Sequence, residues 1–247
     1  MRLSKSWQVT SKDFKEFTKK KNIIFAIAAF PLFITVLLSY VIEFIIQRTS
    51  GSLTGVIELL VLLPSFTFYY TIIAAILPTT IASYSLVGEK TEKSLEPLLA
   101  TPMTDEEILL GKGIATFLPP IGAVYLAAAI FMILADALTY SLLGYYYFPN
   151  SDACIILMIL TPLSAVMSIE VNVMISSRVS DVRVSQQLGF LSVFPMAGVY
   201  LASELGMISF NASTLLIISG ILLLVDLIML YIVRATFSRD EILTRWK

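Results

Sequence analysis

IELLVLLPSFTFYYTIIAAILPTTIASYSLV, the stretch at residues 57–87, carries a single charged residue, Glu58. A helix rises about 1.5 Å per residue, so crossing a bilayer core about 30 Å thick takes roughly 20 apolar residues. The stretch exceeds that length and therefore predicts a membrane-spanning helix. Composition extends the prediction to the whole chain, because 57% of the residues are hydrophobic and 14% are charged, whereas soluble domains carry about 25% charged residues.

Five further apolar stretches predict an all-α membrane protein with six transmembrane helices. The fifth stretch is the shortest and contains Pro195. The first is longer than the apolar core of a signal peptide and is not followed by a small-residue cleavage site, so we expect it to remain in the mature chain. The expected parts are an amphipathic helix at 1–22, a transmembrane domain at 23–235 with spans at about 23–46, 57–87, 114–135, 153–175, 188–202 and 213–233, and a cytoplasmic tail at 236–247.

Basic residues are distributed very unevenly between the two sides of these spans. With six spans, sixteen of the 17 Lys and Arg residues fall on one side and only Arg48 falls on the other. Cytoplasmic loops carry the excess of Lys and Arg in membrane proteins. The sequence therefore predicts that both termini lie on the cytoplasmic side of the cell membrane, since an odd number of spans would destroy the asymmetry.

Several function classes are excluded by residue types that the chain lacks. It has no histidine and one cysteine, Cys154, so it offers no conventional zinc, haem or iron–sulfur ligand set and no Ser-His-Asp or Cys-His nucleophile. A net charge of −1 gives no indication of nucleic-acid binding. No phosphate-binding G-x-x-x-x-G-K-[ST] sequence occurs. Energy for any pumping activity must then come from a partner ATPase or an ion gradient.

The polar leader before the first span has a helical pattern. Trp7, Phe14 and Phe17 fall on one side of a helix and lysines on the other, which is typical of a helix lying among anionic lipid headgroups. Thr10 and Asp13 have the spacing of a capping box. The alternative is a disordered basic leader that only sets the topology.

The polar segment after the second span predicts a short transverse helix at about residues 95–101. Ser94 is a suitable N-cap, and Pro102 disfavours helix at the residue before it. Thr104 and Glu107 have the spacing of a second capping box, which would start the third span.

Three leucines, Leu95, Leu98 and Leu99, form one apolar face on this short helix. An apolar face on a cytoplasmic surface requires a partner, either the chain's own helix ends or a groove on another protein. The alternative is an ordinary structured loop.

Three motifs follow one another in this region: Gly88-Glu89-Lys90, then Ser94-Leu95-Glu96-Pro97-Leu98-Leu99-Ala100-Thr101-Pro102, then Glu107-Ile108-Leu109-Leu110-Gly111-Lys112. Together they resemble the cytoplasmic signature of ABC type-2 permeases, the membrane subunits of many exporters. The basic leader, Pro31 inside the first span and the tail after Phe237 extend the similarity over the chain. Lys93 is a departure, because many members carry glycine there.

The resemblance implies a permease that pairs with a second permease, usually a copy of itself, with two ATP-binding cassette subunits and with membrane lipids. ATP and Mg²⁺ would bind the partner subunits, and this chain would bind no cofactor and would not be an enzyme by itself. The helix at 95–101 would be the coupling helix and the leader the elbow helix, while the second and fifth spans would line the transport path. The residues expected to contact the ATPase are Glu89, Leu95, Glu96, Leu98, Leu99, Thr101 and Pro102.

Ionisable residues at membrane depth are candidates for function. The clear cases are Glu170 in the fourth span and Asp226 in the sixth, which would either contact an ion or substrate or lie near an interface in hydrogen bonds between helices. One side of the second span is polar, within about 80° on a straight helix, and would either edge a transport path or bond to neighbouring helices. Its residues are Ser65, Tyr69, Thr80 and Ser83.

The function predicted from the sequence is that of a permease subunit of an ATP-driven exporter whose substrate is unknown. The alternative is an ion-coupled secondary transporter that uses Glu170 and Asp226, although the paired internal repeats common in such folds are not seen. An intramembrane enzyme and a scaffold or immunity protein that transports nothing are further alternatives.

Overall fold

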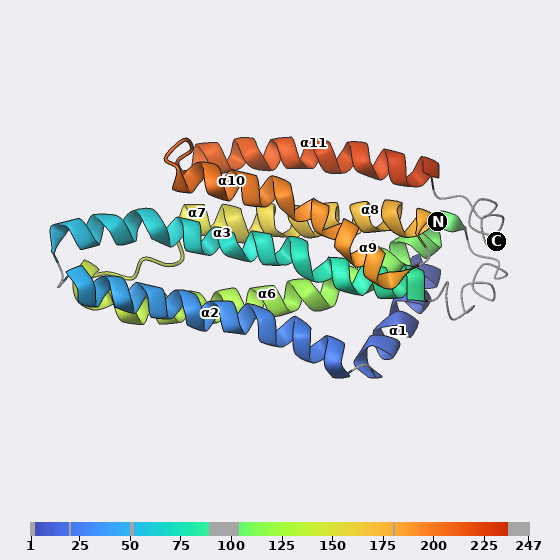
Figure 1. The fold of residues 1–247 in the computed structure, drawn as a ribbon, viewed down its shortest axis with the longest axis horizontal. Helices are drawn as coiled ribbons and strands as arrows, with labels where there is room; N and C mark the ends of the chain where they lie inside the picture. The colour runs from blue at the N-terminus through green and yellow to red at the C-terminus, as the bar shows by residue number, and fades with distance from the viewer. Residues whose placement is uncertain (1–2, 20, 50–51, 89–103, 180, 237–247) are drawn as a thin grey trace.

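The computed structural model describes residues 3–19, 21–49, 52–88, 104–179 and 181–236, and every regular element in these ranges is a helix (Figure 1). The predicted all-α class is thereby confirmed. Five stretches within the described ranges are long and apolar enough to cross a membrane. They are Ile24–Thr49, Leu53–Ser83, Glu106–Leu143, Ser151–Arg178 and Ala212–Arg234.

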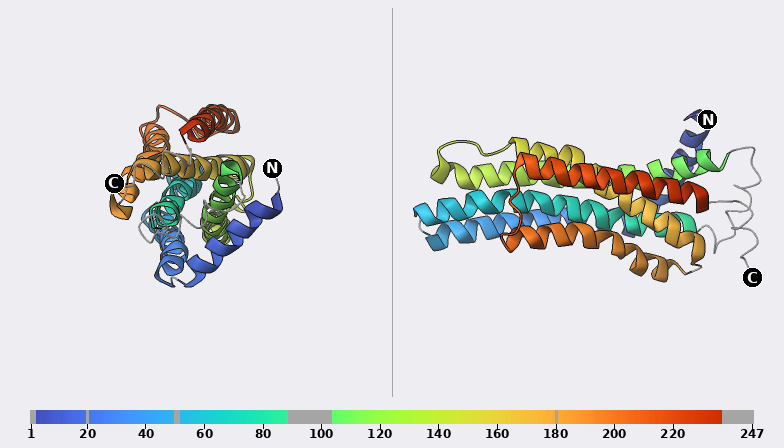
Figure 2. Two further views of the ribbon diagram at one scale, coloured as in Figure 1. Left: turned by 90° about the vertical axis from the view of Figure 1, so that its right-hand side faces the viewer. Right: turned by 90° about the horizontal axis from the view of Figure 1, so that it is seen from above.

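These stretches form the long helices of an elongated bundle (Figures 1 and 2). The fourth is composite, because a short helix α7 (Ser151–Ile155) and a π-helical turn η2 (Ile156–Leu160) precede its main part. The long helices are α2 (Lys21–Thr49), α3 (Leu53–Ser83), α6 (Asp105–Leu143), α8 (Thr161–Arg178) and α11 (Ala212–Thr236).

α3 occupies the centre of the bundle, where it packs against α2, α6, α8 and α10 (Phe194–Glu204). Several of its large side chains, among them Leu59, Leu63 and Phe68, have no solvent-accessible surface. The buried hydroxyl of Tyr70 lies 2.7 Å from the hydroxyl of Thr35 on α2, so its polar atom is hydrogen-bonded. Because α3 is central, most of the polar side chains that alternate with its apolar ones are also buried against neighbouring helices.

α1 (Leu3–Lys19) crosses one end of the bundle obliquely and packs against the beginning of α6 (Figures 1 and 2). Trp7 and Phe14 are exposed, but Phe17 is buried, so the predicted grouping of the three aromatic residues is wrong for Phe17. The buried face recurs every three or four residues, as expected for one side of a helix. Its residues are Ser6, Val9, Thr10, Asp13 and Phe17.

The capping box predicted for Thr10 and Asp13 is also wrong, because α1 already begins at Leu3 and both residues lie inside it. The Thr10 hydroxyl donates to the carbonyl of Ser6 at 3.0 Å and approaches the carbonyl of Gly111 on α6 at 2.9 Å. The Thr10 hydroxyl, which the spacing assigned to a helix cap, therefore contributes to the contact between α1 and α6.

The second predicted capping box is confirmed at the start of α6. Glu107 N–H donates to the Thr104 hydroxyl at 3.3 Å, and Thr104 N–H donates to the Glu107 carboxylate at 3.2 Å. α6 then continues to Leu143, so residues 136–143 are helical and the outer connection to α7 is shorter than expected. Gly144 ends the helix with φ +74°, a left-handed conformation that glycine adopts without strain.

The region expected to hold the fifth span is a broken helix. α9 (Val182–Gly189), a 3₁₀ turn at Phe190–Val193 and α10 follow one another, with Pro195 in the first turn of α10. Figure 1 shows α9 near the end of the bundle at which α1 lies, and α10 continues along the bundle against α3. The chain therefore returns along the bundle between the end of α8 and the beginning of α11.

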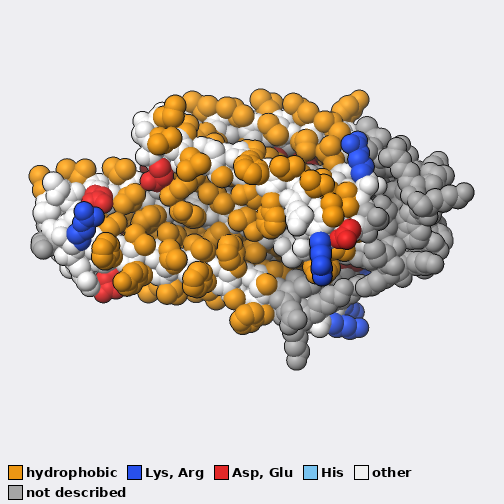
Figure 3. Space-filling view, in the orientation of Figure 1, with side chains coloured by type: hydrophobic (Ala, Val, Ile, Leu, Met, Phe, Trp, Pro, Cys, Tyr) orange, Lys and Arg blue, Asp and Glu red, His pale blue; other side chains and the backbone are white. Residues whose placement is uncertain are grey.

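On the face drawn in Figure 3, hydrophobic side chains cover the middle, and the charged side chains that are coloured lie toward the two ends. Large apolar side chains such as Phe33, Val61 and Ile133 are more than 60% exposed, which is expected where lipid rather than water is the neighbour. Arg48 stands in the last turn of α2 at one end, and the C-terminal ends of α8 and α11 lie at the other end (Figure 1).

Candidate functional site

A row of small polar residues joins α3 to α8 within the bundle. The Ser164 hydroxyl donates to the carbonyl of Thr71 at 3.0 Å. The Ser168 hydroxyl donates to the carbonyl of Ala75 at 2.6 Å and lies 2.9 Å from the Thr79 hydroxyl. Hydrogen bonds and close packing, rather than hydrophobicity, hold helices together in lipid. This row, below called the hydroxyl row, therefore fixes α8 on α3.

The hydroxyl row ends where α9 joins α3 and α8. The Ser83 hydroxyl donates to the Asn172 side-chain oxygen at 3.1 Å, and the Ser185 hydroxyl of α9 donates to Ser83 at 3.1 Å. Gly189 is needed at this junction, because a Cβ there would stand 2.5 Å from Asn172 Oδ1 and 2.6 Å from Thr79 Cγ2. Three helices thus meet at one tightly packed polar point.

The four residues considered for a transport path have different neighbours. Ser83 belongs to the junction just described, and Ser65 is also buried. Tyr69 is partly exposed, and its ring centroid lies 4.7 Å from that of Tyr200 on α10. Thr80 is likewise half-buried.

Glu170 and Asp226, which the sequence separates by more than fifty residues, are brought together by the packing of α8 on α11. The two side chains are 6% and 5% exposed and are close enough to interact electrostatically. Among the described residues, no hydrogen-bond partner is found for Glu170 Oε2 or for either carboxylate oxygen of Asp226. An unpaired buried charge is costly, so this pair is chemically suited to holding a proton or a cation.

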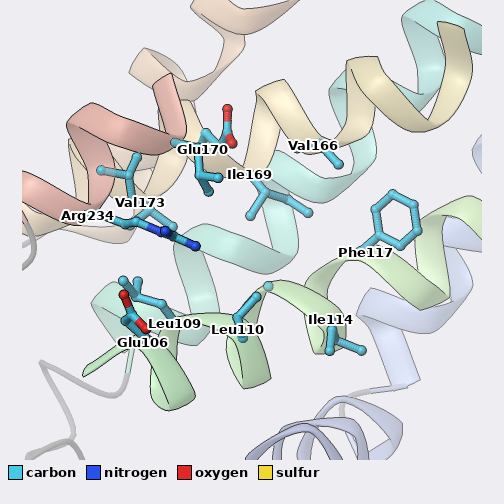
Figure 4. A pocket seen from close by; sticks show the side chains of 13 residues that line it. Glu106, Leu109, Leu110, Ile114, Phe117, Val166, Ile169, Glu170, Val173 and Arg234 are labelled. Atoms are coloured by element: carbon cyan, nitrogen blue, oxygen red, sulfur yellow. The ribbon is translucent and has the colours of Figure 1, made fainter. Parts of the chain in front are cut away.

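A pocket of about 260 Å³ lies between α6, α8 and α11, and Glu170 lines it. Figure 4 shows Leu109, Leu110 and Ile114 of α6 across the space from the α8 residues. Arg234, at the end of α11, also lines this pocket. A basic residue thus lines the same pocket as Glu170. The sequence of either span alone does not indicate this proximity.

A second buried charged group lies where α1 meets the bundle. The Lys112 ammonium on α6 donates to the carbonyl of Ser85 at 3.0 Å and to its hydroxyl at 3.3 Å, and it lies 3.5 Å from Asp13 Oδ2 on α1. The Ser85 hydroxyl donates to the same Asp13 oxygen at 3.0 Å. Both charged side chains are only 3% exposed, a degree of burial that charged residues reach only when paired.

Sequence reasoning did not single out this cluster or the α8 side of the hydroxyl row. Two signals were present in the sequence. One was Lys112 among apolar residues just before the expected third span, and the other was the recurrence of Ser and Asn every four residues on the fourth span, at Ser164, Ser168, Asn172 and Ser176. The predicted ATPase-contact residues lie outside the described residues, in the segment 89–103. They are Glu89, Leu95, Glu96, Leu98, Leu99, Thr101 and Pro102.

An all-helical bundle with several membrane-length helices and an apolar girdle defines the class of multi-pass membrane proteins. Within that class, residues 7–207 match the family model described as ABC-2 family transporter protein. The match covers most of the chain, and the protein belongs to this family: it is an ABC type-2 permease, a membrane transport component that is not itself catalytic. A comparison with curated proteins finds no match.

Proposed function

We propose that the chain is the permease subunit of an ATP-driven exporter, in which two separate ATP-binding cassette subunits act on the segment between α3 and α6. The motif series from Gly88 to Lys112, in a chain of the ABC-2 family, is the observation that carries the proposal. The arrangement of the flanking helices supports it. The turn η1 (Tyr84–Gly88) and the beginning of α6 both lie at the end of the bundle occupied by α1.

The proposed topology has six crossings with both termini in the cytoplasm. The broken helix α9–α10 is the fifth crossing, and the return of the chain between α8 and α11 supports this count. The Lys and Arg asymmetry supports the orientation, because the C-terminal ends of α8 and α11 share an end with α1 while Arg48 is in the last turn of α2. α1 is proposed to be the elbow helix, with Trp7 and Phe14 in the headgroup layer.

The coupling helix at 95–101 is proposed to insert its leucine face into a groove on the ATPase. The double variant Glu96→Lys with Leu98→Asp places a reversed charge and a buried charge in that contact, so the ATPase should no longer co-purify with the permease. The measurement is the amount of ATP-binding cassette subunit recovered per permease from detergent extracts.

A matched control reverses a glutamate and replaces a large side chain by aspartate at the opposite end of the bundle, as Glu58→Lys with Tyr146→Asp, where both side chains are exposed. This control should retain the ATPase. If the Glu96/Leu98 variant retains the ATPase as fully as the control does, the coupling assignment is wrong.

A second copy of the chain is proposed to complete the transport path, with the second and fifth spans of both copies facing each other. Native mass spectrometry of the purified complex should give two permeases and two ATPases, and one permease per complex would contradict this assembly.

Glu170 and Asp226 support a second candidate function, ion-coupled transport. Their burial, their mutual electrostatic interaction and their missing hydrogen-bond partners favour a role in holding a proton or a cation. Flux in vesicles that continues without nucleotide but stops when the ion gradient is collapsed, and that is abolished by Glu170→Gln, would favour this function over the ATP-driven one. Flux that requires nucleotide would reject it.

A further inference from the structure

We propose that Asp13, Ser85 and Lys112, below called the polar latch, make α1, the end of α3 and the beginning of α6 move as one body during transport. The transport role rests on the proposed function. The mechanical statement rests only on the geometry of this chain. Asp13 and Lys112 are positioning residues in this proposal, because they act through the helices that they join.

The polar latch joins three segments that are distant in the sequence. Lys112 contributes from α6, Ser85 from the π-helical turn that follows α3, and Asp13 from α1. Its hydrogen bonds and ion contact span 3.0–3.5 Å. Ser85 occupies the middle, since its hydroxyl donates to Asp13 while it and the Ser85 carbonyl accept from Lys112.

Burial makes the polar latch resistant to opening. Asp13 and Lys112 are each 3% exposed, and separating them would break the contact between two oppositely charged groups in a poorly solvated place. Breaking a buried pair is strongly unfavourable for that reason. A displacement of any one of the three helices is therefore expected to carry the other two with it.

Gly111 allows α1 to approach closely enough for the polar latch to form. A Cβ at Gly111 would lie 2.7 Å from the Ser6 carbonyl oxygen and 2.7 Å from Val9 Cβ, both on α1. The Thr10 hydroxyl also approaches the Gly111 carbonyl at 2.9 Å. By contrast, a Cβ at Gly113 would have nothing within 4 Å. The two residues of the Gly111-Lys112 pair thus have separate purposes: the glycine permits contact and the lysine supplies the charge.

The position of the polar latch in the chain gives it a mechanical consequence. Ser85 precedes residues 89–103 and Lys112 follows them, so both flanks of the proposed coupling segment are joined to each other and to α1. A force applied to that segment would reach α3, α6 and α1 together. Without the polar latch, the same force would move one flank relative to the other.

Distances between spin labels test whether α1 and α6, the two helices that carry the charged pair, move as one body. Labels at Lys15 on α1 and Leu118 on α6, both exposed, are introduced into the full chain in lipid nanodiscs, with Cys154 replaced by Ser. We expect a single narrow distance distribution, and at least a twofold broadening in Asp13→Asn and in Lys112→Met. Distributions as narrow as in the unaltered chain would overturn the proposal.

A glycine pair keeps the test decisive if the charge variants do not fold. Gly111→Ala should lengthen or broaden the α1–α6 distance, because its methyl group meets α1, whereas Gly113→Ala should leave it unchanged. Equal distributions in the two alanine variants would count against the polar latch.

A nucleotide experiment separates this proposal from the proposed function. In the complex with its co-purifying ATPase, ATP with vanadate should leave the Lys15–Leu118 distance unchanged while it shifts labels at Tyr140 of the two copies. In Asp13→Asn the ATP hydrolysis rate should stay within twofold, but the Tyr140 shift should be lost. A Lys15–Leu118 distance that changes with nucleotide in the unaltered complex overturns the polar latch. A complete lack of nucleotide response contradicts the proposed function instead, and the nanodisc distances then decide on the polar latch.

Discussion

α3 and α11 are both long enough to cross a membrane, yet they have opposite surroundings. The protein buries 67% of the most apolar window of α3 but only 22% of that of α11, although α11 is the more apolar helix. Lipid tails solvate leucine as well as a protein core does, so burying an apolar side chain in the bundle gains little free energy. Burying a hydroxyl group there is favourable, because the neighbouring helices offer it hydrogen-bond partners that lipid does not.

The polar residues of each helix follow the same rule. Thr71, Thr79 and Ser83 of α3 are buried in the hydroxyl row. On α11 the buried polar residues are Ser219 and Asp226, and most of its leucines are exposed, although Leu215 and Leu222 are buried. The density of hydroxyl groups therefore distinguishes an interior span from a peripheral one better than its hydropathy does.

A pair of glycine substitutions should give the largest difference between the surroundings of the two helices, because Gly189 on α9 packs against α3 whereas Gly220 lies on α11. Gly189→Val would place its side chain against Asn172 and Thr79, whereas a Cβ at Gly220 on α11 would have nothing within 4 Å. Valine adds two methyl groups beyond a Cβ that would already be too close to its neighbours, so Gly189→Val should cost more than the roughly 1–3 kcal/mol that is typical of overpacking. It should strongly reduce the yield of folded protein, whereas Gly220→Val should not. Similar yields and unfolding midpoints in the two variants would show that the junction with α9 is not close-packed.

Two leucine truncations should give a smaller difference. Leu63 on α3 has no exposed surface and Leu224 on α11 is 62% exposed. Leu63→Ala leaves a cavity, which costs about 2 kcal/mol at the low end of the known range, while lipid fills the space left by Leu224→Ala. The free energy of unfolding in a detergent titration measures both effects. Equal losses would contradict the central position of α3.

The smallest effect is expected for a single hydroxyl group. Ser168→Ala removes the bonds to the Ala75 carbonyl and to Thr79, and such bonds are worth about 0.6 kcal/mol on average in a membrane protein. Ser213→Ala, at an exposed position on α11, is the control. A larger loss in Ser213→Ala than in Ser168→Ala would reverse the comparison.

Local patterns in the sequence predicted those parts of the structure that depend on local interactions. Long apolar stretches predict helices because a helix pairs all its backbone N–H and C=O groups within one segment, as lipid requires. The Thr104–Glu107 capping box likewise forms within four residues. The Thr10–Asp13 pattern has the same spacing, but the two side chains form hydrogen bonds with residues on α6 and η1 instead. Spacing alone does not distinguish these outcomes, because the competing partners lie 72 to 101 residues away.

The charged groups show where prediction from the sequence stopped. Glu170 and Asp226 were recognisable singly as charges at membrane depth, but their association depends on how α8 packs on α11. Lys112 was visible as part of a family motif, yet its purpose became apparent only from the position of Asp13. In both cases the residue type indicated a functional or structural role, and only the packing of the helices identified the partner residue.

The proposed function requires that an ATPase act on the segment between α3 and α6, and comparing the two ends of the bundle tests this claim. A photoreactive amino acid placed at position 98, with position 146 in the outer connection as the control, reports which protein touches each end in intact cells. We predict a cross-link from position 98 to an ATP-binding cassette protein, identified by mass spectrometry, and none to that protein from position 146. Cross-links from position 98 only to this chain or to lipid would contradict the claim.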